Sequence, residues 1–198
     1  MRLFSRSTKQ QKFWAWFDRN TERLFHFESD QEAIFDELGA ALERVHAGLT
    51  FEFGPVLNGK REFIVSADGI RELFPAVRAL VAAAPDLPRW VVIPFRPPKD
   101  LSFSIDMGGS TLLPTDIWFS AEPDGERVGL HLFIRGLTEA NSDLLGGASF
   151  ILLDNALGEY VVETRVGFIE RLPLPDDPQS LGLQPFEAIR SHFDLTIH

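Results

Sequence analysis

The chain has 198 residues, of which 44% are apolar and 24% charged, as is usual for a globular protein large enough to bury a core. It contains no cysteine, which excludes disulfides, thiolate metal sites and cysteine nucleophiles. Its formal net charge of −10 argues against nucleic acid as the main partner, because contacts with phosphate need a basic surface.

The first quarter of the chain predicts two helices. We expect residues 1–8 to be frayed. The segment Lys9–Phe25 then places Phe13 and Phe17 near one face of a helix. A second apolar stripe at helical spacing predicts another helix over residues 29–48, which Gly48 ends.

The charge is uneven along the chain. Residues 1–24 hold six basic and two acidic residues, so the acidic excess lies in the rest of the chain. A basic, aromatic first helix either packs against the domain or lies on an anionic membrane surface. We favour packing, because Trp14 and Trp16 stand in a Trp–Phe stripe at the spacing typical of a buried helix face.

Neither a membrane span nor export is predicted. No apolar run reaches the ~18 residues that a membrane-spanning helix needs. No segment resembles the apolar region of a secretory signal. We therefore expect a cytoplasmic protein of bacterial type.

From Leu49 onward the apolar pattern changes from the helical period to the alternation of strands. Asn58-Gly59 and Pro123-Asp124-Gly125 each separate two apolar segments, as the turn of a β-hairpin does. In chain order we expect a hairpin of Leu49–Phe53 with Phe63–Val65, a helix over Gly69–Ala84, a strand Trp90–Phe95, a strand Leu101–Met107, a hairpin of Ile117–Ala121 with Val128–Ile134, a helix over 142–157, a strand Tyr160–Arg171 and a helix from Pro185 to Leu195.

The order of these elements predicts the fold class. Residues 49–95 and 116–171 each have the order strand–strand–helix–strand, so they form possible pseudo-duplicated ββαβ units. We expect one α+β domain over residues 1–198. It would contain an antiparallel or mixed sheet of about six to seven strands with helices packed on it.

Several phrases of the sequence are similar to those of one bacterial protein family. They are Phe13-Trp14-Ala15-Trp16-Phe17 with Asn20, Leu49-Thr50-Phe51-Glu52-Phe53-Gly54, Ile64-Val65-Ser66-Ala67-Asp68-Gly69, Ala84-Pro85 with Trp90, Phe95-Arg96-Pro97, and Leu152-Leu153-Asp154-Asn155-Ala156-Leu157-Gly158-Glu159-Tyr160. Over roughly residues 10–195 the chain resembles this family of uncharacterised proteins. The resemblance implies a single-domain bacterial protein, and it implies no activity, cofactor or catalytic residue.

The sequence predicts no metal or cofactor site. Glu43 and His46 have the Glu-x-x-His spacing of di-iron helical bundles, but such a site needs a second copy of the motif and two further glutamates. Gly108-Gly109-Ser110 resembles a phosphate-binding loop but lacks the lysine of a Walker motif. His131 occupies an alternate position of a strand and is expected on the outer face of the sheet.

Charged and aromatic residues beside apolar segments are the candidate site residues: Glu52, Trp90, Arg96, Asp154 and Glu159. A carboxylate in such surroundings either has a shifted pKa, as in an active site, or is held by a structural partner such as an arginine. We favour the structural role for these carboxylates.

No motif commits the chain to a reaction, and we lean against an enzyme. The favoured function is non-catalytic binding of a protein or small molecule of unknown identity. Nucleic acid and membranes are not expected as partners, and the oligomeric state is left open. Two alternatives remain: a carboxylate-dependent hydrolase with a cleft near Glu52, Arg96, Asp154 and Glu159, and a membrane-surface binder that uses the first helix. A concave pocket with several polar groups would favour the hydrolase, whereas an exposed apolar face would favour interaction.

Overall fold

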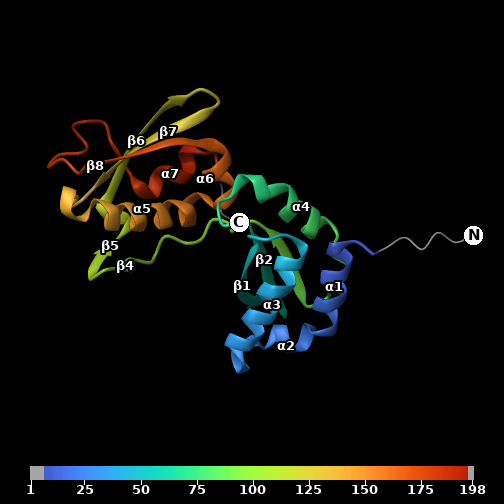
Figure 1. Cartoon of the computed structure of the whole chain (residues 1–198). Coiled ribbons are helices and arrows are strands. Elements are labelled where there is room, and N and C mark those ends of the chain that lie inside the picture. The colour runs from blue at the N-terminus through green and yellow to red at the C-terminus, as the bar shows by residue number, and fades with distance from the viewer. Residues whose placement is uncertain (1–6, 196–198) are drawn as a thin grey trace, which may run out of the picture. The chain divides into compact units, whose positions relative to one another are not determined.

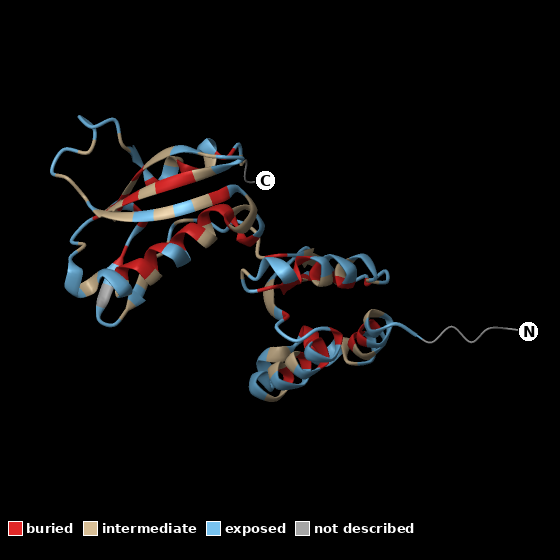
Figure 2. Ribbon diagram, turned by 45° about the horizontal axis from the view of Figure 1, so that its top comes forward, coloured by how far each residue is buried: buried red, intermediate tan, exposed pale blue. Residues whose placement is uncertain are grey.

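The computed structural model describes residues 7–195, which fold as two compact units, an N-terminal unit (Met1–Arg96) and a C-terminal unit (Pro97–His198) (Figure 1). Each unit has its own core of buried apolar residues (Figure 2). Each also combines helices with a small sheet, so the chain belongs to the α+β class, as predicted.

The N-terminal unit is a three-stranded sheet with helices packed on it. Its elements are α1 (Lys9–Arg19), α2 (Thr21–Phe25), α3 (Gln31–Val45), β1 (Thr50–Leu57), β2 (Lys60–Ser66), α4 (Phe74–Ala82) and β3 (Trp90–Pro94). The strands lie in the order β1-β2-β3, with β1 antiparallel and β3 parallel to β2. The hairpin turns at Asn58 and Gly59, whose φ angles of 52° and 76° suit the twist of the flanking strands.

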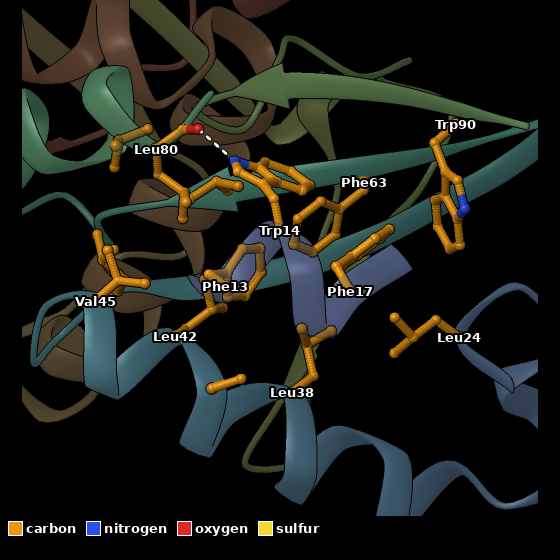
Figure 3. Packing of buried hydrophobic residues seen from close by; sticks show 14 of the residues in the cluster. Phe13, Trp14, Phe17, Leu24, Leu38, Leu42, Val45, Phe63, Leu80 and Trp90 are labelled. Atoms are coloured by element: carbon orange, nitrogen blue, oxygen red, sulfur yellow. Dashed lines mark hydrogen bonds between the residues drawn. The ribbon is translucent and has the colours of Figure 1, made fainter. Parts of the chain in front are cut away.

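Aromatic side chains of α1 form the centre of this unit's core (Figure 3). Trp14 and Phe17 are buried against Phe63 of β2, and the ring centroids of Phe17 and Phe63 are 4.8 Å apart. The Trp14 indole N–H donates a hydrogen bond of 2.8 Å to the Leu80 carbonyl of α4. The prediction that the first helix packs through its Trp–Phe stripe is therefore confirmed.

The C-terminal unit contains a two-stranded and a four-stranded sheet. Its elements are β4 (Ile105–Met107), β5 (Ser110–Leu112), β6 (Ile117–Asp124), β7 (Arg127–Ile134), α5 (Ser142–Leu157), α6 (Glu159–Arg165), β8 (Val166–Pro173), β9 (Gln184–Pro185) and α7 (Ile189–His192). The larger sheet has the order β8-β7-β6-β9, with β7 antiparallel to β6 and parallel to β8. Both units thus contain a hairpin followed by helix and a parallel third strand. A duplication itself stays a prediction.

One face of the four-stranded sheet packs against the helices of this unit (Figure 1). Leu152 and Ala156 of α5 share a buried core with Phe119 of β6 and Leu130 of β7. Residues from α6 and α7 belong to the same core. Because successive side chains of a strand point to opposite faces, the residues that alternate with this buried set point away from the helices.

The side chain of Arg190 in α7 caps the C-terminal end of α5. Its guanidinium donates to the carbonyl of Ala156 at 2.8 Å and to the carbonyl of Lys99. The Lys99 N–H donates to the Asn155 carbonyl at 2.7 Å. The last carbonyls of a helix have no intrahelical partner, so these bonds satisfy groups that would otherwise need water. Burial lowers the pKa of the Arg190 guanidinium.

The prediction of a single sheet of about six to seven strands is wrong. Residues 7–195 form separate sheets of three, two and four strands. Each hairpin finds its third strand within its own unit, and Pro97-Pro98 after β3 have no N–H groups with which to continue a ladder. The predicted strand Leu101–Met107 shortens to β4. Whether the whole chain is one cooperative domain stays a prediction.

The predicted strand Tyr160–Arg171 is wrong in its first half. Residues 159–165 form α6, and the strand begins only at Val166. The Thr164 hydroxyl donates to the Tyr160 carbonyl one turn earlier, a bond typical of threonine within a helix. Val162 is buried in the core, so tertiary packing overrides the β-propensity of this segment.

The expected fraying of residues 1–8 falls mostly on residues 1–6, which lie outside the described residues. Thr8 is the N-cap of α1: its hydroxyl accepts from the Gln11 N–H, and its own N–H donates to the Gln11 side chain. This reciprocal pair is a capping box, so fraying is wrong for Thr8.

Candidate functional site

Glu52 and Arg96, two of the predicted site residues, come together near the end of β3. The Arg96 guanidinium donates to the Ser66 hydroxyl and to the Asp68 carboxylate, both at 3.0 Å, and its Nε lies 3.9 Å from the Glu52 carboxylate. Phe95, just before it, has a φ of 65°, which is uncommon for a bulky residue and turns the chain sharply. The cluster is an ion-pair network that ties β1, β2 and β3 together at one end.

Trp90 is a core residue of the N-terminal unit. Its ring is buried and meets the Phe17 ring edge-on, with centroids 4.9 Å apart. Its indole N–H donates to the Thr21 hydroxyl at 2.8 Å. A tryptophan that is buried and hydrogen-bonded in this way serves packing and does not present a surface to a ligand.

Asp154 and Glu159 flank the junction of α5 and α6. Asp154 is half-buried in the last turn of α5, and Glu159 is fully buried at the first position of α6. Gly158 between the helices has a φ of 80° and a ψ of 151°, which breaks the helix. The four residues of the hydrolase alternative therefore fall into two units, with Glu52 and Arg96 in the N-terminal one.

The formal charge divides unequally between the two units. Residues 1–96 contain 13 basic and 13 acidic residues, whereas residues 97–198 contain 6 basic and 16 acidic ones. The net charge of −10 therefore belongs entirely to the C-terminal unit. A field of this sign attracts basic partners and repels nucleic acid.

Apolar side chains gather on the face of the four-stranded sheet that points away from α5. The register places Trp118 of β6 opposite Phe133 of β7, and Phe133 opposite Leu172 of β8. Phe168 of β8 lies on the same face and is 37% exposed. Among the described residues, these four stand outside the core of the unit. We call the eight residues of this surface the open face: Trp118, Ser120, Glu122, His131, Phe133, Phe168, Glu170 and Leu172.

Acidic side chains stand beside the apolar residues of the open face. His131 lies between two of them, with its Nδ1 2.7 Å from Glu170 and its Nε2 3.6 Å from Glu122. The imidazole meets the Phe168 ring edge-on, with centroids 5.2 Å apart. Both carboxylates are more than half exposed, at 57% for Glu122 and 54% for Glu170. They therefore remain accessible to a cationic partner.

A cavity of about 470 Å³ adjoins the open face at Trp118. Its other walls are Arg135 and residues 174–179, which belong to the loop between β8 and β9. Asp176 in this loop is exposed, and within the described part of the chain no basic side chain pairs with it. Arg135 is held by the Asp116 carboxylate, with Nε and Oδ1 3.1 Å apart.

Sequence reasoning found only part of the open face. His131 was predicted on the outer face of its sheet and lies there. Trp118 was missed, because a tryptophan beside apolar residues such as Ile117 and Phe119 is usually a core residue. One signal was available: Trp118 stands two residues before the polar Ser120 and therefore points to the same face of the sheet as that polar side chain.

Compared with protein-family models, curated proteins and solved structures, the chain shows no match. The resemblance to an uncharacterised bacterial family therefore assigns no role to any residue of the site. Among residues 7–195, no three His, Asp or Glu side chains are arranged to hold a metal ion. Nor is any helix in that described range long and apolar enough to cross a membrane.

Proposed function

We propose that this chain is a non-catalytic protein-interaction module, and that the open face of its C-terminal unit binds a basic segment of a partner protein. One observation carries the proposal: four large apolar side chains gather on one sheet face, outside the core of their unit. Phe168 is exposed, and Trp118, Phe133 and Leu172 are half-buried. A partly exposed apolar patch beside polar groups is typical of an interaction surface. Aromatic residues in particular are enriched at the centres of interfaces.

The charge of the unit supports a basic partner. Glu122 and Glu170 lie on the open face itself and are accessible to solvent. Lysine or arginine side chains of a partner would pair with them, and the excess of acidic residues in the unit would speed the encounter. A second copy of this chain would bring an equally acidic unit to the same face, which disfavours self-association there.

The hydrolase alternative has less support. Hydrolysis needs an acid or base and a charge-stabilising group that converge on one reacting atom. At Arg96, the Ser66 hydroxyl oxygen and one carboxylate oxygen of Asp68 accept hydrogen bonds from the guanidinium. The residues that line the cavity at Trp118 offer carboxylates and a guanidinium but neither histidine nor serine.

The membrane-surface alternative requires a free apolar face on the first helix. Phe13, Trp14 and Phe17 of α1 are buried in the core of their unit, so this face already has a partner (Figure 3). Binding a bilayer through α1 would require the helix to leave that core. We keep the cytoplasm as the proposed compartment of the module.

Capture from the native host tests this proposal, with the intact chain and its Phe168→Ser variant as baits. Phe168 is partly exposed and outside the core, so the substitution should leave the fold intact. We expect the wild-type chain to capture a protein with a basic segment that the variant loses. Once purified, that protein should bind the chain directly, with an affinity that falls as salt increases.

The matched control is Ile70→Ser, which removes an exposed apolar side chain of the N-terminal unit (46% exposed). It should capture the same protein as the wild type. The proposed function would be overturned if Phe168→Ser captured the same protein as Ile70→Ser and the wild type. It would also be overturned if the captured proteins had no basic segment.

A further inference from the structure

We infer that the cavity beside Trp118 holds a cationic side chain, arginine or lysine, of the polypeptide that binds the open face. The inference rests on the proposed function but concerns a separate place in the C-terminal unit. Trp118 belongs to both the open face and the wall of the cavity. A polypeptide on the face could therefore place a neighbouring side chain in the cavity. The volume of about 470 Å³ is ample for one long side chain.

Trp118 provides the aromatic wall of the cavity. The electron-rich face of an indole attracts a guanidinium or ammonium group, and tryptophan is the aromatic residue that does so most strongly. Among residues 7–195 the Trp118 indole N–H has no acceptor, whereas those of Trp14 and Trp90 have acceptors within the N-terminal unit. The Trp118 N–H can therefore donate to a carbonyl of the bound polypeptide.

Asp176 provides the charge. Its carboxylate is exposed and, within the described residues, has no cation beside it. Asp177 accepts a bond from the Ser180 N–H at 3.2 Å and adds a second negative charge. Arg135 also lines the cavity, but Asp116 compensates its charge at 3.1 Å. The groups around the cavity therefore carry a net negative charge.

The loop that carries Asp176 is held in shape by its own backbone. Pro175 and Pro178 restrict φ on either side of the two aspartates. The N–H groups of Gly182 and Leu183 donate to carbonyls of residues 179 and 178, at 3.0 and 3.1 Å. A carboxylate on a preorganised loop needs less ordering when a cation binds, which favours affinity.

Indole ¹H–¹⁵N NMR of the intact chain tests the inference, with the N-acetyl methylamides of arginine and lysine as probes at constant ionic strength. We expect a saturable shift of the Trp118 resonance, while the resonances of the buried Trp14 and Trp90 stay in place. The uncharged citrulline analogue should cause no shift. Trp118→Ala identifies the resonance by removing it, and the unchanged Trp14 and Trp90 signals show that the variant is folded.

Asp176→Asn should weaken cation binding about tenfold, because it removes the charge from the ionic hydrogen bond. The matched control is Glu126→Gln, which removes a charge from the exposed turn between β6 and β7 and should change the affinity less than about twofold. Equal cation binding by the Asp176→Asn variant and the wild type would overturn the inference. So would an unmoved Trp118 resonance with both cationic probes, or a saturable shift caused by inorganic phosphate.

The two proposals fail in distinguishable ways. Phe168→Ser should remove the protein partner and leave binding of the small cations intact, because Phe168 does not line the cavity. Conversely, if the cavity does not bind the small cations, the inference fails, whereas capture of a basic partner that Phe168→Ser loses would still support the proposed function.

Discussion

The Phe168 ring lies directly over Gly129, such that a Cβ atom on Gly129 would overlap the ring. The two residues belong to neighbouring strands, β8 and β7, where the register shifts between Val128 and Leu130. The absence of a side chain at Gly129 thus makes room for an aromatic ring on the open face.

Gly129→Ala should displace the Phe168 ring and weaken partner binding by roughly fivefold or more. The ring is partly exposed and can swing into solvent, so the free energy of unfolding should fall by less than about 1 kcal/mol. Titration calorimetry with the captured partner and urea unfolding measure the two effects.

Gly39→Ala is the control for this substitution. Apart from the adjoining residues and backbone of α3 itself, no atom lies within 4 Å of a Cβ built at this position. Because alanine favours a helix over glycine, the variant should be more stable by about 0.5–1 kcal/mol and bind normally. Unchanged binding by Gly129→Ala would show that the position of the Phe168 ring does not matter.

Trp14→Ala should destabilise the N-terminal unit by about 3–5 kcal/mol, the usual cost of removing a buried aromatic. Trp14 is 3% exposed, and the change also removes its hydrogen bond to the Leu80 carbonyl. Trp16 lies two residues further along α1 and is only half-buried, so Trp16→Ala should cost only about 1 kcal/mol. Equal losses in urea unfolding would refute the docking of α1 through Trp14.

Gly158→Val should destabilise the C-terminal unit by about 2 kcal/mol or more. The φ of 80° and ψ of 151° at this position lie in a region that is essentially restricted to glycine. Gly147→Ala in the same helix is the control, since its Cβ would make only an ordinary contact of 3.6 Å with the Met107 sulfur. Thermal unfolding compares the two variants. A wild-type melting temperature for Gly158→Val would contradict the expectation that valine strains the backbone at this position.

Acid stability should depend on Glu28. Its own backbone N–H and then the Arg61 guanidinium hold the pKa of this carboxyl below its ordinary value of 4.5. A carboxylate with a lowered folded-state pKa stabilises the fold above its unfolded pKa, and that contribution is lost as the pH falls through the folded value.

Glu28→Gln should therefore lessen the loss of stability of the N-terminal unit between about pH 5 and about pH 3. Tryptophan emission during urea unfolding reports mainly on this unit, which holds three of the four tryptophans. A variant whose unfolding midpoint falls as steeply with acidification as that of the wild type would contradict this role for Glu28.

Calorimetry tests whether the chain is one cooperative domain. The sequence predicts that residues 10–195 unfold in a single transition, because its pattern of apolar segments is interrupted at length only over 172–184, near the C-terminus. In the structure, residues 95–104 at the unit boundary also lie outside helices and strands. The two units have separate cores, so the alternative outcome is two transitions, one for each unit. Two resolved transitions, one of them shifted by Trp14→Ala and the other by Gly158→Val, would refute a single domain.

Elements with strong local signals could be predicted from the sequence. The helix α5 coincides with its predicted span, and the first hairpin turns at Asn58-Gly59, where left-handed φ angles are easily adopted. The segment after Gly158 could not be predicted. Its alternating valines and threonine suit a strand, but burial of Val162 in the core decides for a helix, and that burial depends on distant residues.

The candidate site was harder to predict than the fold. Alternation along one strand places His131 outward, which is a local property. It does not say which face of a sheet the helices will cover, so the position of Trp118 opposite to the buried Ile117 and Phe119 did not by itself mark it as a site residue. The acidic excess was visible in the composition, but its restriction to residues 97–198 became apparent only with the unit boundary at Arg96.

The most direct test of partner binding by the open face is titration calorimetry of the purified partner into the wild-type chain and its Phe168→Ser variant. If the open face binds a basic segment, Phe168→Ser should raise the Kd about tenfold or more, and the wild-type affinity should fall with added salt. Ile70→Ser should keep the wild-type Kd. Equal Kd values for the wild type and Phe168→Ser would show that the partner does not bind through the open face.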